Sequence, residues 1–159
     1  MVAALLSPLF ALLLALPNTK ATVELPSTGP GGWIKLDRPA LVAAYQGPGG
    51  ALLAITRAQV PNTAAWRSRT RDAYVAEIAK GALAKLPGAK ELSRKLGDAN
   101  GVPALDLEAR TRNGATVVLR YLLFRTYALA LAIEVGTGGD VAAARAIAKS
   151  FAPPKKADP

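Results

Sequence analysis

An α+β fold is predicted, in which two principal helices cover a mostly antiparallel, twisted sheet as an α/β/α sandwich. Short apolar stretches separated by glycine-rich turns indicate strands that follow one another as hairpins. Two longer segments repeat apolar residues every three or four positions, which is typical of helices that bury one face. The last strand is apolar on both faces, so we expect a layer on each side of the sheet. At 159 residues the chain has the size of one domain.

The first predicted hairpin joins residues 41–45 to residues 52–56, which are both apolar and strand-like. Residues 46–50 connect them with three glycines and a proline, and these residue types favour a turn. The cluster lacks the Lys-Ser/Thr pair of a P-loop, so we interpret it as a plain turn and not as a phosphate site.

Residues 70–86 are predicted to form the first helix, because their apolar residues fall on one helical face. Pro87-Gly88 ends it. The expected buried residues are Tyr74, Val75, Ile78, Ala82, Leu83 and Leu86.

Three further strands and a helix complete the prediction. Residues 105–109 alternate apolar and polar, and the hairpin signal Asn113-Gly114 leads into residues 116–124. Residues 127–135 place large apolar side chains on one face and alanines on the other, which leaves room for a helix to lie close. Asp140 is a good N-cap for a final helix that carries apolar residues on one side.

Residues 1–21 are predicted to be a secretory signal peptide. Residues 1–17 carry no charged side chain, and their apolar run is shorter than the roughly 20 residues that a spanning helix needs. Thr19 and Ala21 are small residues at the positions that a signal peptidase inspects, so we expect cleavage after Ala21. The product would be periplasmic or secreted, without a transmembrane span. A buried N-terminal helix is the alternative that the Ala and Leu content leaves open.

The folded domain is predicted to span residues 33–151. Residues 22–32 are rich in Pro, Gly, Ser and Thr, which indicates a flexible lead. Residues 152–159 are rich in proline and charge, and we expect them to be a disordered tail.

The composition excludes several classes of chemistry. The chain contains no cysteine and no histidine, which rules out disulfide scaffolds, cysteine nucleophiles, His-ligated metals and Ser-His-Asp catalysis. Its net charge of +9 favours anionic partners. Because Lys and Arg are spread along the chain and aromatic residues make up only 6%, the pattern of nucleic-acid binders is absent, and we expect no nucleic-acid partner.

The order of these elements resembles that of PsbP-like domains, over about residues 33–151. The resemblance rests on short motifs: residues 55–57, the helix of residues 70–86, the step Gly101-Val102-Pro103-Ala104 into alternating strands, Tyr127 at the start of the last strand, and residues 147–151 at the end. It implies an α/β/α sandwich shared with the Ran-binding Mog proteins and exported bacterial relatives. It also implies a non-catalytic binding or assembly module, and it assigns no functional residue to this chain.

Trp66, Arg67, Arg69 and Arg71 form one candidate binding patch for an anion or a partner. If this segment is helical, Arg67 and Arg71 share a face at the positive end of the helix dipole, where a bound phosphate, sulfate or carboxylate would stabilise them. The alternative is an extended segment whose arginines are solvated.

Asp106 and Glu108 form a second candidate, for acid and base catalysis. Two residues apart on a strand, they share a face at a spacing of roughly 6.5 to 7 Å. Arg110 lies on the same face, and Arg112 and Arg120 could approach across the turn, in which case the acids are ionised members of a charge ladder.

We therefore expect an exported, non-catalytic binding or assembly module with no cofactor and no bound metal. Its partner would be an unknown protein or an anionic component of the envelope. Two alternatives remain open. The first is a hydrolase or transferase that uses Asp106 and Glu108, with a hard cation such as Ca²⁺ or Mg²⁺ if it needs one. The second is a binder of the envelope surface that acts through net charge alone.

Overall fold

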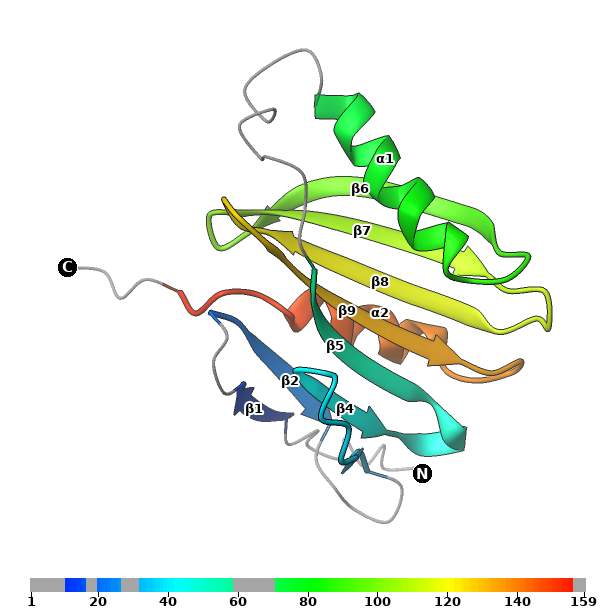
Figure 1. The fold of residues 1–159 in the computed structure, drawn as a ribbon. Helices are drawn as coiled ribbons and strands as arrows, with labels where there is room; N and C mark the ends of the chain where they lie inside the picture. Colours follow the sequence, from blue (N-terminus) through cyan, green and yellow to red (C-terminus); the bar gives the residue numbers. More distant parts are fainter. Residues whose placement is uncertain (1–10, 17–19, 27–31, 59–70, 156–159) are drawn as a thin grey trace, which may run out of the picture.

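The computed structural model describes residues 11–16, 20–26, 32–58 and 71–155 (Figure 1). Its elements, in chain order, are β1 (Ala11–Ala15), β2 (Thr22–Pro26), β3 (Ile34–Lys35), β4 (Ala43–Gln46), the short 3-10 helix η1 (Pro48–Gly50), β5 (Leu52–Ala58), α1 (Arg71–Ala84), β6 (Lys90–Ala99), β7 (Val102–Arg110), β8 (Thr116–Leu123), β9 (Ala128–Val135) and α2 (Val141–Ser150). Within this part of the chain, seven strands form an antiparallel sheet in the order β3-β4-β5-β9-β8-β7-β6, and β1 pairs separately with β2. The predicted α+β class is confirmed.

The large sheet is a four-stranded meander to which a hairpin is added. Strands β6 to β9 each pair with the next strand in sequence. Strand β5 then pairs with β9, from Leu52 opposite Glu134 to Ala58 opposite Ala128. Strands β4 and β5 confirm the hairpin predicted for residues 41–45 and 52–56.

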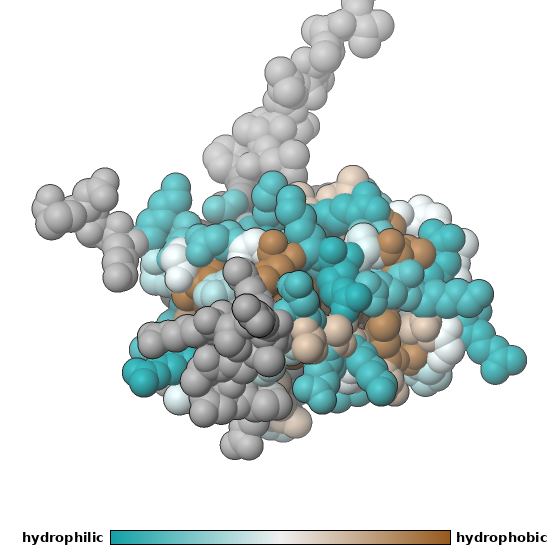
Figure 2. Space-filling view, turned by 90° about the horizontal axis from the view of Figure 1, so that it is seen from above, coloured by the Kyte–Doolittle hydropathy of each residue, from teal (hydrophilic) through white to brown (hydrophobic). Residues whose placement is uncertain are grey.

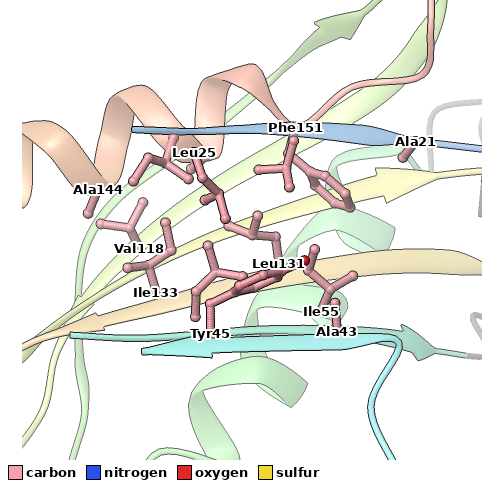
Figure 3. Packing of buried hydrophobic residues seen from close by; sticks show 14 of the residues in the cluster. Ala21, Leu25, Ala43, Tyr45, Ile55, Val118, Leu131, Ile133, Ala144 and Phe151 are labelled. Carbon is pink, nitrogen blue, oxygen red and sulfur yellow. The ribbon is translucent and has the colours of Figure 1, made fainter. Parts of the chain in front are cut away.

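Helix α2 covers one face of the sheet. Its cap is the predicted one, because the Asp140 carboxylate accepts a hydrogen bond of 2.9 Å from the backbone N–H of Ala143. Phe151, directly after the helix, is fully buried. Figure 3 shows Phe151 near Leu25, with Leu131 among the side chains packed below them. This is the main core, and it joins α2, β2, and the facing sides of β4, β5 and β9.

Helix α1 lies on the opposite face of the sheet (Figure 1). Three of its buried residues, Val75, Ala79 and Ala82, pack in two clusters with alternate residues of β7 and β8. Ala128 belongs to one cluster and Ala132 packs against the other, so the alanine face of β9 meets the helix as predicted. Both faces of the sheet are therefore covered, which confirms the sandwich.

Two Asn-Gly pairs make turns of the meander. Asn113-Gly114 lies between β7 and β8 as predicted, and Gly114 has a φ of 85°. Asn100-Gly101 connects β6 to β7 with φ values of 52° and 87°, the conformation that a two-residue hairpin turn requires.

The structure differs from the sequence prediction in several segments. Strand β6 was not predicted, because its mostly exposed residues lack an apolar period. The expected flexible lead of residues 22–32 begins instead with β2, whose Val23 and Leu25 are buried in the main core. The expected tail begins with Ala152, which forms an antiparallel bridge with Thr22. The folded body therefore extends at least from Thr22 to Ala152.

The range predicted as a signal peptide overlaps β1, and Leu16 belongs to the main core. Cleavage after Ala21 stays a prediction. Among the described helices, none is long and apolar enough to cross a membrane.

The surface seen from above Figure 1, on the side of β6 and α1, is mostly hydrophilic (Figure 2). Apolar areas on this face are small and separated by hydrophilic side chains. The two lysines and the arginine of β6 are exposed, and charged residues on a long edge strand oppose pairing with other chains.

Candidate functional site

A charged groove of about 500 Å³ lies between β6, β7 and helix α2. It forms because α2 packs mainly on β8, β9 and β2, so that the described part of the chain covers the same face of β6 and β7 less fully. Its polar lining comes from four elements: Ser93, Lys95 and Asp98 from β6, Asp106 and Glu108 from β7, Arg120 from β8, and Arg145 and Lys149 from α2. The groove thus contains the two carboxylates that the sequence predicted to share a face.

Asp106 is held by Arg120 in a two-pronged ion pair. The two residues lie directly opposite each other in the register of β7 and β8. Arg120 Nε and Nη2 donate to the Asp106 carboxylate oxygens at 2.6 and 2.9 Å. The Arg120 side chain is 7% exposed and the Asp106 side chain 43%. This pair confirms the expected approach of Arg120 across the hairpin.

Arg120 also caps the C-terminal end of α2. Its Nη1 donates to the backbone carbonyl of Lys149 at 2.8 Å and to that of Phe151 at 3.3 Å. Both carbonyls lie at the end of the helix, where backbone oxygens lack partners within the helix. One buried guanidinium therefore joins the sheet to the last turn of α2.

Glu108 is held by Arg145 of α2, a partner that the sequence analysis did not identify. Arg145 Nε and Nη2 donate to the two carboxylate oxygens at 2.8 and 2.7 Å. Across the strand Glu108 faces Val118 and Ser93, so the nearest cation comes from the helix above. The spacing of Arg145 and Lys149, four residues apart, already predicts that they share a face of α2.

The pKa of Glu108 is lowered from its ordinary value. The largest cause is the hydrogen bonding by Arg145, which burial of the carboxyl partly opposes and the positive charges of Arg145 and Arg110 reinforce. A carboxylate held ionised in this way is a poor general acid at neutral pH. The charge-ladder interpretation of Asp106 and Glu108 therefore fits their geometry better than catalysis does.

The two lysines of the groove differ from its arginines. Among the described residues, neither Lys95 nor Lys149 has an acidic side chain within ion-pair distance. Lys95 lies directly across from Asp106 in the register of β6 and β7, but the Asp106 carboxylate is engaged by Arg120. The groove therefore offers two ammonium groups without an ion-pair partner, beside two arginine–carboxylate pairs and the Asp98 carboxylate, which accepts a hydrogen bond of 2.9 Å from the backbone N–H of Gly101.

The first candidate patch lies almost entirely outside the described residues. Trp66, Arg67 and Arg69 are not described, and Arg71 is described only as the first residue of α1. The patch stays a prediction. Within the described residues, no group of three acidic side chains is placed to hold a metal ion.

We expect the stabilising effect of Glu108 to depend on pH. Because its pKa is lower in the folded chain than in the unfolded one, the stabilisation is present above the unfolded pKa of about 4.3 and is lost as the pH falls through the folded pKa. Chemical unfolding between pH 7 and pH 3 should show Glu108→Gln less stable than wild type at pH 7, with the difference shrinking toward pH 3. Arg145→Met should reproduce this profile, and a difference independent of pH would contradict the expectation.

Comparison with solved structures places this arrangement in a known fold. Cyanobacterial PsbP (CyanoP) from Synechocystis sp. PCC 6803 is similar over 97% of this chain and 98% of that chain, with a TM-score of 0.64 and 13% sequence identity. The chain has a PsbP-like fold. A protein of unknown function from Pseudomonas aeruginosa, described as a putative regulator, is similar over 92% of this chain and 99% of that chain, with a TM-score of 0.50 and 21% identity. No protein-family model and no curated protein matches the chain.

The PsbP-like fold confirms the resemblance drawn from the short motifs of the sequence. At these identities the similarity carries the fold alone. The function must therefore be argued from the groove itself.

Proposed function

We propose that this PsbP-like chain is an exported, non-catalytic binding or assembly module that engages an anionic partner through the charged groove. The observation that supports it most is the contrast within the groove. Asp106 and Glu108 are each paired with an arginine, while Lys95 and Lys149 have no acidic side chain within ion-pair distance among the described residues. The net charge of +9 draws anions toward the molecule, and the unpaired lysines are where they would bind.

Export rests on the predicted signal peptide, and the absence of catalysis rests on the paired carboxylates. PsbP-like domains as a class serve mainly as binding or assembly modules, which supports the same proposal by analogy. An enzyme that used Asp106 and Glu108 would have to break two two-pronged ion pairs before either acid could act.

A matched pair of charge reversals tests the proposal. Lys95→Glu/Lys149→Glu changes the groove, and Lys80→Glu/Lys85→Glu makes the same change in net charge on exposed residues of α1 and the turn after it. Binding of immobilised polyglutamate is measured by biolayer interferometry at low and at physiological salt. We expect the groove variant to bind at least tenfold more weakly and the control to change far less.

The same experiment separates the rival function. A binder that acts through net charge alone would lose affinity equally in both double variants, and its binding would nearly vanish at physiological salt. Equal losses would therefore replace the groove proposal with the charge-driven one.

A further inference from the structure

The C-terminal segment anchors one edge of strand β2 to the body of the protein. The backbone N–H of Thr22 donates to the carbonyl of Ala152 at 2.9 Å, and the return bond is 3.2 Å. The backbone N–H of Glu24 donates to Ser150 Oγ at 2.9 Å. Val23 and Leu25 are buried in the main core. Strand β2 therefore has attachments to the domain that do not involve β1.

The other edge of β2 is occupied by β1. Because backbone groups alternate in direction along a strand, the N–H and C=O groups of Val23 and Leu25 point away from the C-terminal segment. They face Leu14 and Leu12 of β1 in the antiparallel register. Pro26 has no N–H and ends the strand.

Cleavage after Ala21 would remove β1 and leave β2 in place. The outer edge of β2 would then present unpaired N–H and C=O groups at Val23 and Leu25, and loss of the buried Leu16 would expose apolar surface beside it. We propose that this edge is a docking site for an extended apolar segment of a partner polypeptide, which adds antiparallel to β2 in the place of β1. This inference rests on the proposed export and processing, but it does not depend on the groove.

The occupant is expected to be a partner strand and not a second copy of this chain. Antiparallel self-pairing that satisfies both Val23 and Leu25 would place Glu24 directly opposite Glu24 of the second copy. Like charges directly opposite each other on paired strands are destabilising. Strand β1 shows what the edge accepts, which is five uncharged residues of the sequence Ala-Leu-Leu-Leu-Ala.

The test uses the exported chain and a synthetic peptide. The chain is recovered after export, and its intact mass shows whether cleavage followed Ala21. A fluorescent peptide with the sequence of residues 10–16 and two added lysines is titrated into the processed chain and into the full chain. We expect the processed chain to bind it at least tenfold more tightly, because β1 occupies the edge in the full chain.

N-methylated peptides serve as matched controls. Methyl groups on the amides that correspond to Leu12 and Leu14 remove both donors to β2 and should weaken binding at least tenfold. A methyl group on the amide that corresponds to Leu13 points away from β2 and should leave binding nearly unchanged.

Several outcomes would overturn the proposal. These are no peptide binding by the processed chain, equal effects of the two methylation patterns, or a processed chain that forms a dimer and excludes the peptide. An intact mass that retains residues 1–21 would overturn it as well, while the groove test with polyglutamate would still stand. If near-ultraviolet circular dichroism shows that the processed chain has lost its fold, the full chain with Leu12→Pro/Leu14→Pro is used in its place. We expect this variant to bind the peptide at least tenfold more tightly than the unaltered full chain, and the same outcomes would overturn the proposal.

Discussion

Phe151→Ala is expected to lower the free energy of unfolding by about 3–5 kcal/mol, the usual cost of truncating a fully buried aromatic side chain. Phe151 is 0% exposed and packs in the main core, where α2, β2 and the sheet meet. Its removal leaves a cavity that contacts all three. Urea unfolding at pH 7 measures the loss, which should appear as a lower midpoint with an unchanged slope.

Leu92→Ala is the control for this prediction, because Leu92 is 47% exposed on β6. We expect it to change the free energy of unfolding by less than about 0.5 kcal/mol. Similar losses in the two variants would contradict the placement of Phe151 in the core. Phe151→Leu, with an expected loss of under about 1.5 kcal/mol, serves if the alanine variant does not fold.

Arg120→Met is expected to lower the free energy of unfolding by about 2–3 kcal/mol. The cost comes mainly from the carbonyls of Lys149 and Phe151, which lose their guanidinium donor, since the Asp106 side chain is 43% exposed and can be hydrated. Urea unfolding measures the loss. Hydrogen exchange should show faster exchange at the end of α2, because that donor also holds the helix on the sheet.

Arg145→Met is the matched control for Arg120→Met, because its exposed guanidinium binds one carboxylate and no helix carbonyl. It should destabilise far less and leave exchange at the end of α2 unchanged. A neutral or stabilising Arg120→Met would contradict the prediction, and it would mean that an apolar side chain satisfies this site as well as the ion pair does.

The elements predicted best from the sequence are those whose apolar residues recur at the regular spacing of a strand or a helix. Strand β7 alternates in burial as its residues alternate in polarity, β8 and β9 are mostly apolar and buried on both faces, and α2 begins after the predicted cap. The two-sided burial of β9 followed from its alanine face, because a helix can approach a sheet closely only over small side chains.

The elements that were missed carry weaker signals. Strand β6 is a mostly exposed edge strand, so it has no buried face that would require alternating apolar residues. Asn100-Gly101 nevertheless marks the hairpin that follows it. Strand β2 has the alternation Val23, Glu24, Leu25, which the neighbouring prolines and glycines obscured. Asn100-Gly101 and the alternation of residues 23–25 are the short signals that mark these two strands.

Half of the groove could be predicted from the sequence. The shared face of Asp106 and Glu108 and the approach of Arg120 follow from the period of a strand and the position of a turn. The pairing of Glu108 with Arg145 depends on the orientation of α2 relative to the sheet, and no local sequence pattern predicts that orientation. Lys95 was missed together with the strand that carries it.

The long separation in sequence between β5 and β9 governs how the molecule assembles. The meander from β6 to β9 closes through short turns, whereas β5 reaches β9 only after α1 and three strands have been spanned, a closure with a larger entropic cost. The main core also needs Val23 near one end and Phe151 near the other. A chain that emerges N-terminus first must therefore keep these apolar residues uncovered until its final helix has been synthesised.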